Sequence, residues 1–395
     1  MDDTAPRIRM ITRLSEVPEA DWDRVANPVG EPHDPFLSWA FLDALETSGA
    51  ATPETGWTPC HLLLEHPDGR LLGAMPLYAK THSQGEFVFD HAWADAYERA
   101  GGQYYPKLLN AVPFTPVTGR RRLVAPGPEA ARWQQTLLLG AVQLAEQNGF
   151  SSLHLNFLKA DEATRLDQEG LLIRTDQQFH WINQGYESFS DVLAAMTSAK
   201  RKTLRKERQK AQHGLRFLQL TGAEIQPEHW DIFYDFYMDT GRRKWGQPYL
   251  NRDTFALIGE RMADKILLIL ALEDETPIAG ALNLIGESTL YGRYWGCTSP
   301  RPMLHFETCY YQAIDYAIAH RLDTVEAGAQ GGHKLARGYV PTRTYSAHWI
   351  AHPGLRDAID HYLRRERAAV DQDAAYLQTR TPFKTSHPPE QDPDE

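Results

Sequence analysis

Short apolar runs separated by turn-forming residues recur along the chain, and they predict β-hairpins. In the first half, 62–65 and 71–77 flank a His-Pro-Asp-Gly turn, and in the second half 269–273 and 278–284 flank an Asp-Glu-Thr-Pro turn. Each hairpin ends its first strand on Glu and places Gly-Ala near the start of its second strand. Strand-like runs joined by such turns are the usual hairpin signal, and their repetition indicates a duplicated domain.

A helix and a short strand follow each hairpin and support the duplication. The expected elements are a helix over 137–148 and a strand over 152–155 in the first half, and a helix over 309–320 and a strand over 324–327 in the second. We therefore predict a first domain over 1–175 and a second over 176–375. Residues 376–395 are rich in proline and charge, which predicts a disordered tail.

The second half has a clear order of elements. The pattern predicts a strand at 179–183, a basic helix at 190–213, a strand at 215–220, helices at 227–243 and 252–263, strands at 265–272, 278–285 and 289–296, a helix at 305–320, a strand at 324–327, a glycine-rich loop at 328–339, a strand at 343–350 and a helix at 355–375. Hairpin-joined strands are antiparallel, whereas a strand that returns after a helix can be parallel. The fold class is therefore α/β with a mixed sheet.

Composition narrows the class of protein. The chain has 395 residues and a formal charge of -11, long enough for more than one core and too acidic for a general nucleic-acid coat protein. Its longest apolar run, Ile266–Leu272, is far shorter than a transmembrane helix, and Met1–Met10 lacks a signal-peptide pattern. The 3 cysteines form no metal-binding or disulfide pattern. We expect a cytoplasmic protein without a metal ion.

Three motifs carry a resemblance to a known family. They are Leu-Tyr-Gly-Arg-Tyr-Trp-Gly at 290–296, Leu-His-Phe-Glu-Thr-Cys-Tyr-Tyr at 304–311 and Glu-Ala-Gly-Ala-Gln-Gly-Gly-His-Lys-Leu-Ala-Arg-Gly-Tyr at 326–339. The chain resembles the Gcn5-related N-acyltransferase (GNAT) fold, and as a tandem of two such domains it resembles the FemAB-like branch, whose members transfer aminoacyl groups from tRNA to cell-wall precursor peptides. The resemblance extends to about residue 370.

The resemblance implies an N-acyltransferase of peptidoglycan biosynthesis that acts on an amine of a small molecule or peptide. It implies acyl-CoA or aminoacyl-tRNA as the donor. The pyrophosphate-binding loop of acetyl-CoA-dependent relatives is replaced here by 297–304, Cys-Thr-Ser-Pro-Arg-Pro-Met-Leu. An acetyl-CoA-dependent N-acetyltransferase and a non-catalytic ligand-binding module are the alternatives.

Acyl transfer requires a polarised carbonyl, a proton acceptor and a proton donor. The resemblance implies that a backbone N–H within 291–296 polarises the carbonyl. Gly292 and Gly296 are typical of a β-bulge, although they also fit a plain strand with small residues. The candidate catalytic residues are Glu326, His333, Tyr294 and Tyr339. Glu326 ends an apolar strand beside a polar loop, where it can accept a proton or form an ion pair with Lys334 or Arg337.

Polar side chains around these motifs are candidates for holding substrate or an anion. They are Arg293, Arg301, His305, Glu307, Gln330, Lys334, Arg337, Trp245 and Tyr249. Arg301 and the start of its helix can dock an anion, or the prolines there can simply stiffen the turn. Glu307 can instead complement the helix dipole, and the loop 328–339 can be an ordinary charged surface. Cys309 has His305 as its only visible partner, which disfavours it as a nucleophile.

The basic helix is the remaining unusual feature. Between 200 and 210 it carries seven Lys or Arg against one Glu, and Arg201, Arg205 and Arg208 fall on one stripe. Such a stripe can bind tRNA or a polyanionic lipid-linked substrate, or it can be a solvated helix face.

Overall fold

The protein is described by a computed structural model that covers residues 5–244, 248–328 and 331–384. The elements of the first half are β1 (Arg7–Ile11), α1 (Glu19–Ala26), α2 (Trp39–Thr47), β2 (Trp57–Pro59), β3 (His61–Glu65), β4 (Leu71–Met75), β5 (Tyr78–Lys80), α3 (His91–Arg99), β6 (Lys107–Asn110), β7 (Leu123–Val124), α4 (Ala130–Gln147), β8 (Ser152–Leu158) and α5 (Ala160–Gln168).

The second half is built from the elements that follow. They are β9 (Leu172–Ile182), α6 (Phe189–Ala195), α7 (Ser198–Gln212), β10 (Arg216–Thr221), α8 (Pro227–Lys244), α9 (Arg252–Met262), β11 (Ile266–Glu273), β12 (Thr276–Ile285), β13 (Thr289–Cys297), α10 (Leu304–Phe306), a π-helical turn (Glu307–Tyr311), α11 (Gln312–Ala319), β14 (Thr324–Glu326), β15 (Val340–Ile350) and α12 (Pro353–Gln378).

A mixed sheet runs through both halves of the molecule. Its strand order is β10-β11-β12-β13-β14-β9-β15-β8-β6-β5-β2, and a smaller sheet has the order β1-β3-β4-β7. In the large sheet, β13 and β14 are parallel, as are β6 and β8, and the other neighbours are antiparallel. The mixed α/β class expected from the sequence is confirmed.

Two long strands, β9 and β15, join the halves. They pair antiparallel from Leu172 opposite His348 to His180 opposite Val340. On its other edge β15 pairs with β8, and the end of β9 pairs with β14. A strand late in the sequence therefore completes the sheet of the first half, and the boundary expected near residue 175 falls inside β9. The division into two domains stays a prediction.

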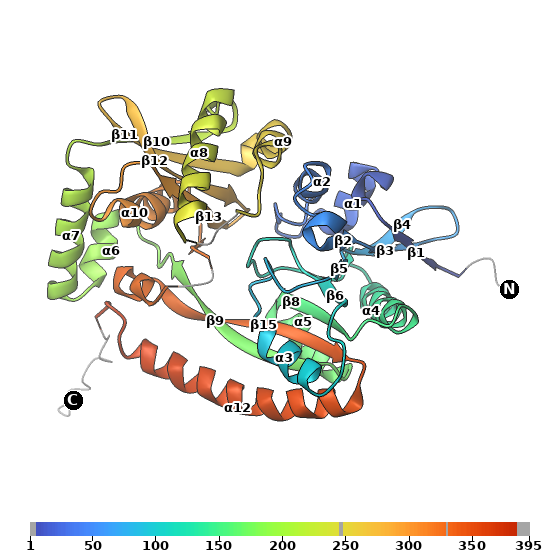
Figure 1. Ribbon diagram of the computed structural model, residues 1–395. Helices are drawn as coiled ribbons and strands as arrows, with labels where there is room; N and C mark the ends of the chain where they lie inside the picture. The colour runs from blue at the N-terminus through green and yellow to red at the C-terminus, as the bar shows by residue number, and fades with distance from the viewer. Residues whose placement is uncertain (1–4, 245–247, 329–330, 385–395) are drawn as a thin grey trace, which may run out of the picture.

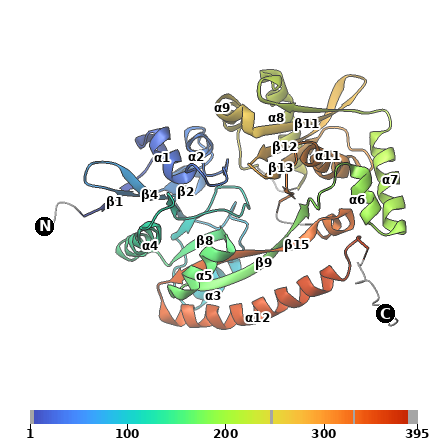
Figure 2. The same cartoon turned by 180° about the vertical axis from the view of Figure 1, so that it is seen from behind.

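Helices fix the angle between the halves. Figures 1 and 2 show α12 lying along β9 and β15 and spanning both halves of the molecule. On the opposite side α2 meets α9, where Ser48 Oγ lies 2.8 Å from Thr254 Oγ1 and Arg261 pairs with Asp43 at 2.6 Å. One buried cluster contains aromatic side chains of both halves, such as Phe36 and Phe255. The two halves therefore share a core.

The predicted hairpins and the three-stranded meander are confirmed. β3 pairs with β4, and β11, β12 and β13 follow one another as antiparallel neighbours. The first hairpin lies in the small sheet, whereas the second lies in the large one.

The single basic helix expected at 190–213 is wrong, because the backbone is extended at Met196 and separates α6 from α7. This break is held by the chain's C-terminal part: Thr197 N–H donates to Pro382 O at 2.9 Å, and Lys384 N–H donates to Ala195 O at 3.0 Å. Phe383 is partly buried there against the core. α12 also continues to Gln378, so the described part of the expected tail, 376–384, is ordered. Residues 385–395 lie outside the described chain.

Candidate functional site

A β-bulge interrupts the pairing of β12 and β13, as the glycines predicted. Leu282 pairs with Tyr294 and Asn283 pairs with Gly292, which leaves Arg293 as an extra residue on β13. The parallel pairing of β13 with β14 ends just before, at Tyr291 and Glu326. A bulge at the end of a pairing turns backbone groups away from the ladder, where a ligand can reach them.

Gly292 and Gly296 fit this bulge for different reasons. A Cβ on Gly292 would lie 3.2 Å from Asn283 Oδ1 and 3.4 Å from Glu326 O. A Cβ on Gly296 would overlap the backbone of Phe236 in α8. Gly296 therefore allows α8 to approach the strand closely, while Gly292 leaves space above the Asn283 side chain.

Two adjoining cavities surround the bulge. The smaller has a volume of about 90 Å³ and is lined by Ala281, Leu282, Asn283, Gly292, Arg293, Tyr294, Trp295, His305, Cys309, Tyr310 and Ala327. The larger has a volume of about 390 Å³ and is lined by Thr240, Arg243, Trp295, Cys297, Pro300, Arg301, Leu304 and His305. Both are lined by Trp295 and His305, whose rings lie 5.1 Å apart, so the cavities form one candidate site.

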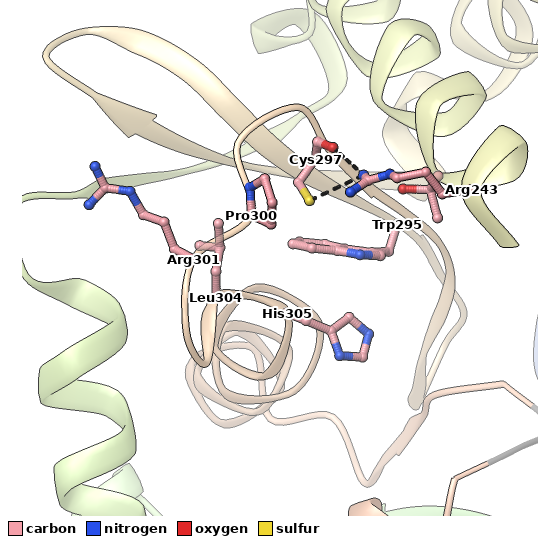
Figure 3. Close-up of a pocket in the computed structure, with 8 residues that line it drawn as sticks. Arg243, Trp295, Cys297, Pro300, Arg301, Leu304 and His305 are labelled. Atoms are coloured by element: carbon pink, nitrogen blue, oxygen red, sulfur yellow. Dashed lines mark hydrogen bonds between the residues drawn. The ribbon is translucent and has the colours of Figure 1, made fainter.

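The larger cavity is mainly apolar. Figure 3 shows the Trp295 indole between the turn after β13 and the His305 imidazole, while Arg243 reaches the Cys297 carbonyl, to which it donates a hydrogen bond of 2.6 Å. The Arg301 guanidinium points away from both rings and forms an ion pair with Glu273. The first helical segment beyond this turn, α10, has 3 residues. An anion site built on Arg301 therefore receives no support from this geometry.

Glu326 is buried behind the bulge, with 6% of its surface exposed. Its Oε2 pairs with Arg293 Nη2 at 3.1 Å, and its Oε1 lies 3.9 Å from His180 Nε2. Of the two possibilities for Glu326, the ion pair is the one that forms, but its partner is Arg293 of the bulge and not Lys334 or Arg337. The Arg293 side chain is 2% exposed. The buried ion pair of Arg293 and Glu326 therefore holds the bulged residue in place.

The loop 328–339 is more buried than its composition predicts. Residues Gly332–Arg337 form a 3-10 helix, in which Lys334 is 1% exposed and Arg337 is 7% exposed. Arg337 pairs with Glu207 at 3.0 Å and its guanidinium lies 3.3 Å from the centre of the Phe306 ring. Arg337, a predicted candidate for holding an anion, therefore already has a carboxylate partner within the protein.

Lys334 has no carboxylate partner among the described residues. Its ammonium donates to Gly328 O at 2.9 Å. Burial, with the nearby positive charge of Arg293, lowers the pKa of Lys334 to about 8. A buried ammonium in this state can stabilise negative charge that develops in front of it.

A tyrosine and a histidine connect the small cavity with the molecular surface. Tyr310 lines the cavity, and its OH lies 2.8 Å from His333 Nε2. His333 is exposed, and its ring lies 6.2 Å from that of His305. Burial raises the pKa of Tyr310, so this hydroxyl keeps its proton at neutral pH.

The two tyrosines proposed as proton donors occupy different surroundings. Tyr294 lines the small cavity and donates its OH to Phe114 O at 3.4 Å, and burial raises its pKa to about 12. Tyr339 is fully buried and lines neither cavity, and its OH has no hydrogen-bond partner among the described residues. Only Tyr294 of this pair lies where a ligand can bind.

The π-helical turn carries a buried carboxylate that α7 neutralises. Glu307 is 0% exposed and accepts hydrogen bonds from Arg208 at 2.9 Å and from Gln212 at 2.9 Å. Arg208 also pairs with Asp315 at 2.6 Å. The prediction that Arg208 faces a polyanion is therefore wrong, because two carboxylates draw it inward. Of its stripe, Arg205 is exposed and Arg201 is half-buried.

A loop of the first half contacts Tyr294 of the site, and this contact was not predicted from the sequence. Residues 111–121 place Phe114 O against Tyr294 and Pro116 O against Gln178, which donates at 3.0 Å. The Tyr249 ring stacks on Phe114 with centroids 5.0 Å apart, and neither residue lines the two cavities, so a role of Tyr249 in an acceptor pocket stays a prediction. The two prolines and the apolar residues of 112–117 were the only features of the sequence that could have indicated a buried loop here. Trp245 and Gln330 lie outside the described residues.

The site is therefore framed by an antiparallel meander with a bulge in its third strand, and by a parallel strand that pairs with the third strand only before the bulge. The chain belongs to the FemAB-like family, described as peptidoglycan biosynthesis/recognition, which matches residues 13–385. A comparison with curated protein sequences finds no match.

Solved structures support the fold. FemX is 13% identical, covers 89% of this chain and 100% of its own, and has a TM-score of 0.54. A conserved protein of unknown function from Bacteroides thetaiotaomicron is 10% identical, covers 88% of this chain and 100% of its own, and has a TM-score of 0.51.

Among the described residues, no helix combines the length and apolar character that crossing a bilayer requires. Within 5–244, 248–328 and 331–384, His, Cys, Asp and Glu form no group with metal-binding geometry.

Proposed function

We propose that this protein is an N-acyltransferase that moves an acyl or aminoacyl group onto an amine, with a cell-wall precursor peptide as the acceptor class. The observation that carries the proposal is the bulge at Arg293, which opens onto a cavity lined by His305 and Tyr310. Membership of the FemAB-like family supports the acceptor class.

The chemistry assigned to these residues is direct attack. The amine nitrogen forms a bond to the carbonyl carbon, while the bond from that carbon to the ester oxygen or thioester sulfur of the donor breaks. A backbone N–H at the bulge and the buried ammonium of Lys334 stabilise the negative charge on the carbonyl oxygen. His305 accepts one proton from the attacking nitrogen, and Tyr310 donates one to the leaving atom.

His333 then restores the Tyr310 proton from solvent, because it is exposed and already within hydrogen-bond distance of that hydroxyl. In this scheme Glu326 is not the base. It stays ionised against Arg293 and holds the bulge in place. Tyr294 orients the first-half loop at the cavity rim.

Two donor classes remain in the proposal. Aminoacyl-tRNA is favoured by the exposed cations of α7, among them Lys202, Arg205 and Lys206. Acetyl-CoA is the second candidate, because the larger cavity adjoins the turn at which GNAT proteins hold pyrophosphate.

The test is a transfer assay with a defined acceptor. The purified protein is mixed with a lysine-containing muropeptide precursor and either alanyl-tRNA or acetyl-CoA, and the acceptor is followed by mass spectrometry. We expect a mass gain of one alanyl or one acetyl group that disappears in the Tyr310→Phe variant. An unchanged acceptor with both donors would contradict the proposed function.

A further inference from the structure

A buried amide in the wall of the small cavity has no role in the chemistry described above. Asn283 is 0% exposed and lies in the apolar strand β12, between Leu282 and Leu284. Asparagine is unfavourable in strands, and a buried polar group costs stability unless it is hydrogen-bonded. An apolar side chain would suit the position better if packing were its only role.

The orientation of this amide is fixed by its neighbours. Asn283 Nδ2 donates to Leu267 O at 3.2 Å and lies 3.5 Å from Ala281 O. Exchanging the nitrogen and oxygen would point Oδ1 at two carbonyl oxygens, which only accept hydrogen bonds. The oxygen therefore faces the other way, toward Gly292.

Asn283 Oδ1 has no hydrogen-bond partner among the described residues. Asn283 pairs with Gly292, the residue directly before the bulged Arg293, and lines the small cavity, so its unpaired oxygen lies beside the bulge in the cavity wall. A buried acceptor left unpaired costs about 1–3 kcal/mol. Occupation by a ligand N–H would remove that cost.

We propose that Asn283 is a specificity-determining residue whose Oδ1 accepts a hydrogen bond from an amino group on the carbon next to the transferred carbonyl. The inference rests on the proposed function, because it assumes that the carbonyl of the donor lies at the bulge. Asn283 Oδ1, which accepts a hydrogen bond, then lies next to the backbone N–H that binds the carbonyl oxygen. This pair matches an acyl group whose carbonyl carbon is bonded to a carbon that carries an amino group. A plain acyl group offers a methyl or methylene there and leaves Oδ1 unpaired.

Two further observations agree with this ligand class. The small cavity, at about 90 Å³, has room for a few heavy atoms, since one water takes a share of about 30 Å³ in the liquid. The cations nearby are Arg293, which Glu326 neutralises, and Lys334, which has no carboxylate partner among the described residues. This surplus of positive charge favours a neutral amine, which still donates an N–H, over an ammonium.

The test compares two small probes that differ only in the α-amino group, L-alaninamide and propionamide. Their dissociation constants are measured by NMR titration of the full chain. We expect L-alaninamide to bind about fivefold more tightly than propionamide, the ratio that one neutral hydrogen bond supplies. A ratio near one in the wild-type protein, or no binding of L-alaninamide, would overturn the inference.

Two variants remove the acceptor in different ways. Asn283→Leu deletes the amide, and Gly292→Ala places a methyl group 3.2 Å from Oδ1 while leaving the amide and its Leu267 bond intact. We expect the ratio of the two dissociation constants to fall to about one in both variants. If Asn283→Leu does not fold, the result for Gly292→Ala tests the inference. Gly280→Ala is the matched control, because its methyl meets Leu270 and Phe233 at 3.1 Å elsewhere on β12.

The outcomes separate this inference from the proposed function. A protein that keeps the fivefold preference but transfers no group contradicts only the proposed transferase activity. Two results would contradict only the role of Asn283. In one, the protein transfers a group although its two dissociation constants are about equal; in the other, the fivefold preference for L-alaninamide persists in both variants.

Discussion

At the scale of single residues, the site contains groups that folding alone does not favour. Lys334 is buried with a backbone carbonyl as its only hydrogen-bond acceptor among the described residues, and Asn283 leaves an amide oxygen unpaired. Each group opposes stability, and they lie in two neighbouring parts of the molecule: Asn283 pairs beside the bulge, and Lys334 belongs to the 3-10 helix after β14. Such local conflicts between stability and composition are typical of functional sites.

Replacing Lys334 by Met is expected to raise stability. The Lys334 pKa falls from 10.5 to about 8 in the folded protein, so the unfolded chain holds this proton more tightly. The resulting penalty is fully present below pH 8 and disappears as pH rises toward 10.5. At pH 7 Lys334→Met should therefore gain up to about 3 kcal/mol of unfolding free energy and lose transfer activity.

Urea denaturation between pH 7 and pH 10 checks this prediction. The wild-type protein should become more stable over this range, and the variant should lose that rise. Lys206→Met, an exposed lysine of α7, is the control and should behave as the wild type. A destabilised Lys334→Met variant would show that the ammonium is structural.

At the scale of elements, α7 holds two parts of the site through neighbouring residues of opposite charge. Arg208 pairs with Glu307 of the π-helical turn, and Glu207 pairs with Arg337 of the 3-10 helix. The Tyr311 hydroxyl also donates to Glu207 at 2.7 Å. The helix that presents cations to solvent is thus joined to the segments that line and support the cavity.

Arg208→Ala and Arg205→Ala are expected to have opposite effects. Removing Arg208 leaves Glu307 buried without its cation and should cost about 3 kcal/mol of unfolding free energy. Removing the exposed Arg205 should leave stability unchanged but weaken binding of tRNA, with the slope of log Kd against log salt reduced by about one. Thermal denaturation and a binding titration over a salt series measure the two effects. Equal stability of the two variants would contradict the inward role of Arg208.

Local elements could be predicted from the sequence because their signals lie within a few residues of one another. The hairpins, the meander and the glycine-marked bulge all follow from neighbouring positions. The first part of β9 could not be predicted from the sequence. Residues 173–178 are largely polar, and the partner strand β15 lies more than 150 residues away. The ion pairs of Glu326 and Glu307, and the approach of the loop 111–121, depend on packing between distant segments in the same way.

At the scale of the whole molecule, the two halves are held in one sheet by β15. Ala347 is fully buried and pairs with Leu155 of β8 on one edge and with Ile173 of β9 on the other. Loss of order at this strand would therefore spread into both halves. We infer that the halves do not open independently.

Ala347→Pro tests this coupling. Proline removes a backbone N–H from the middle of the sheet and should cost on the order of 3 kcal/mol. Hydrogen exchange followed by mass spectrometry should then show faster exchange in both β8 and β9. Thr342→Pro is the control, because Thr342 is paired with β9 at Gln178 and precedes the β8 pairing. Unchanged protection of β8 in Ala347→Pro would contradict the coupling.

The position of β15 also matters during synthesis. A ribosome translates the first half long before it reaches residue 340, so β8 can pair with β6 on one edge while its other edge stays open until β15 has been made. An open strand edge readily pairs with other chains. The nascent protein should therefore depend on chaperones until β15 has been synthesised, and overproduction without them should yield inclusion bodies.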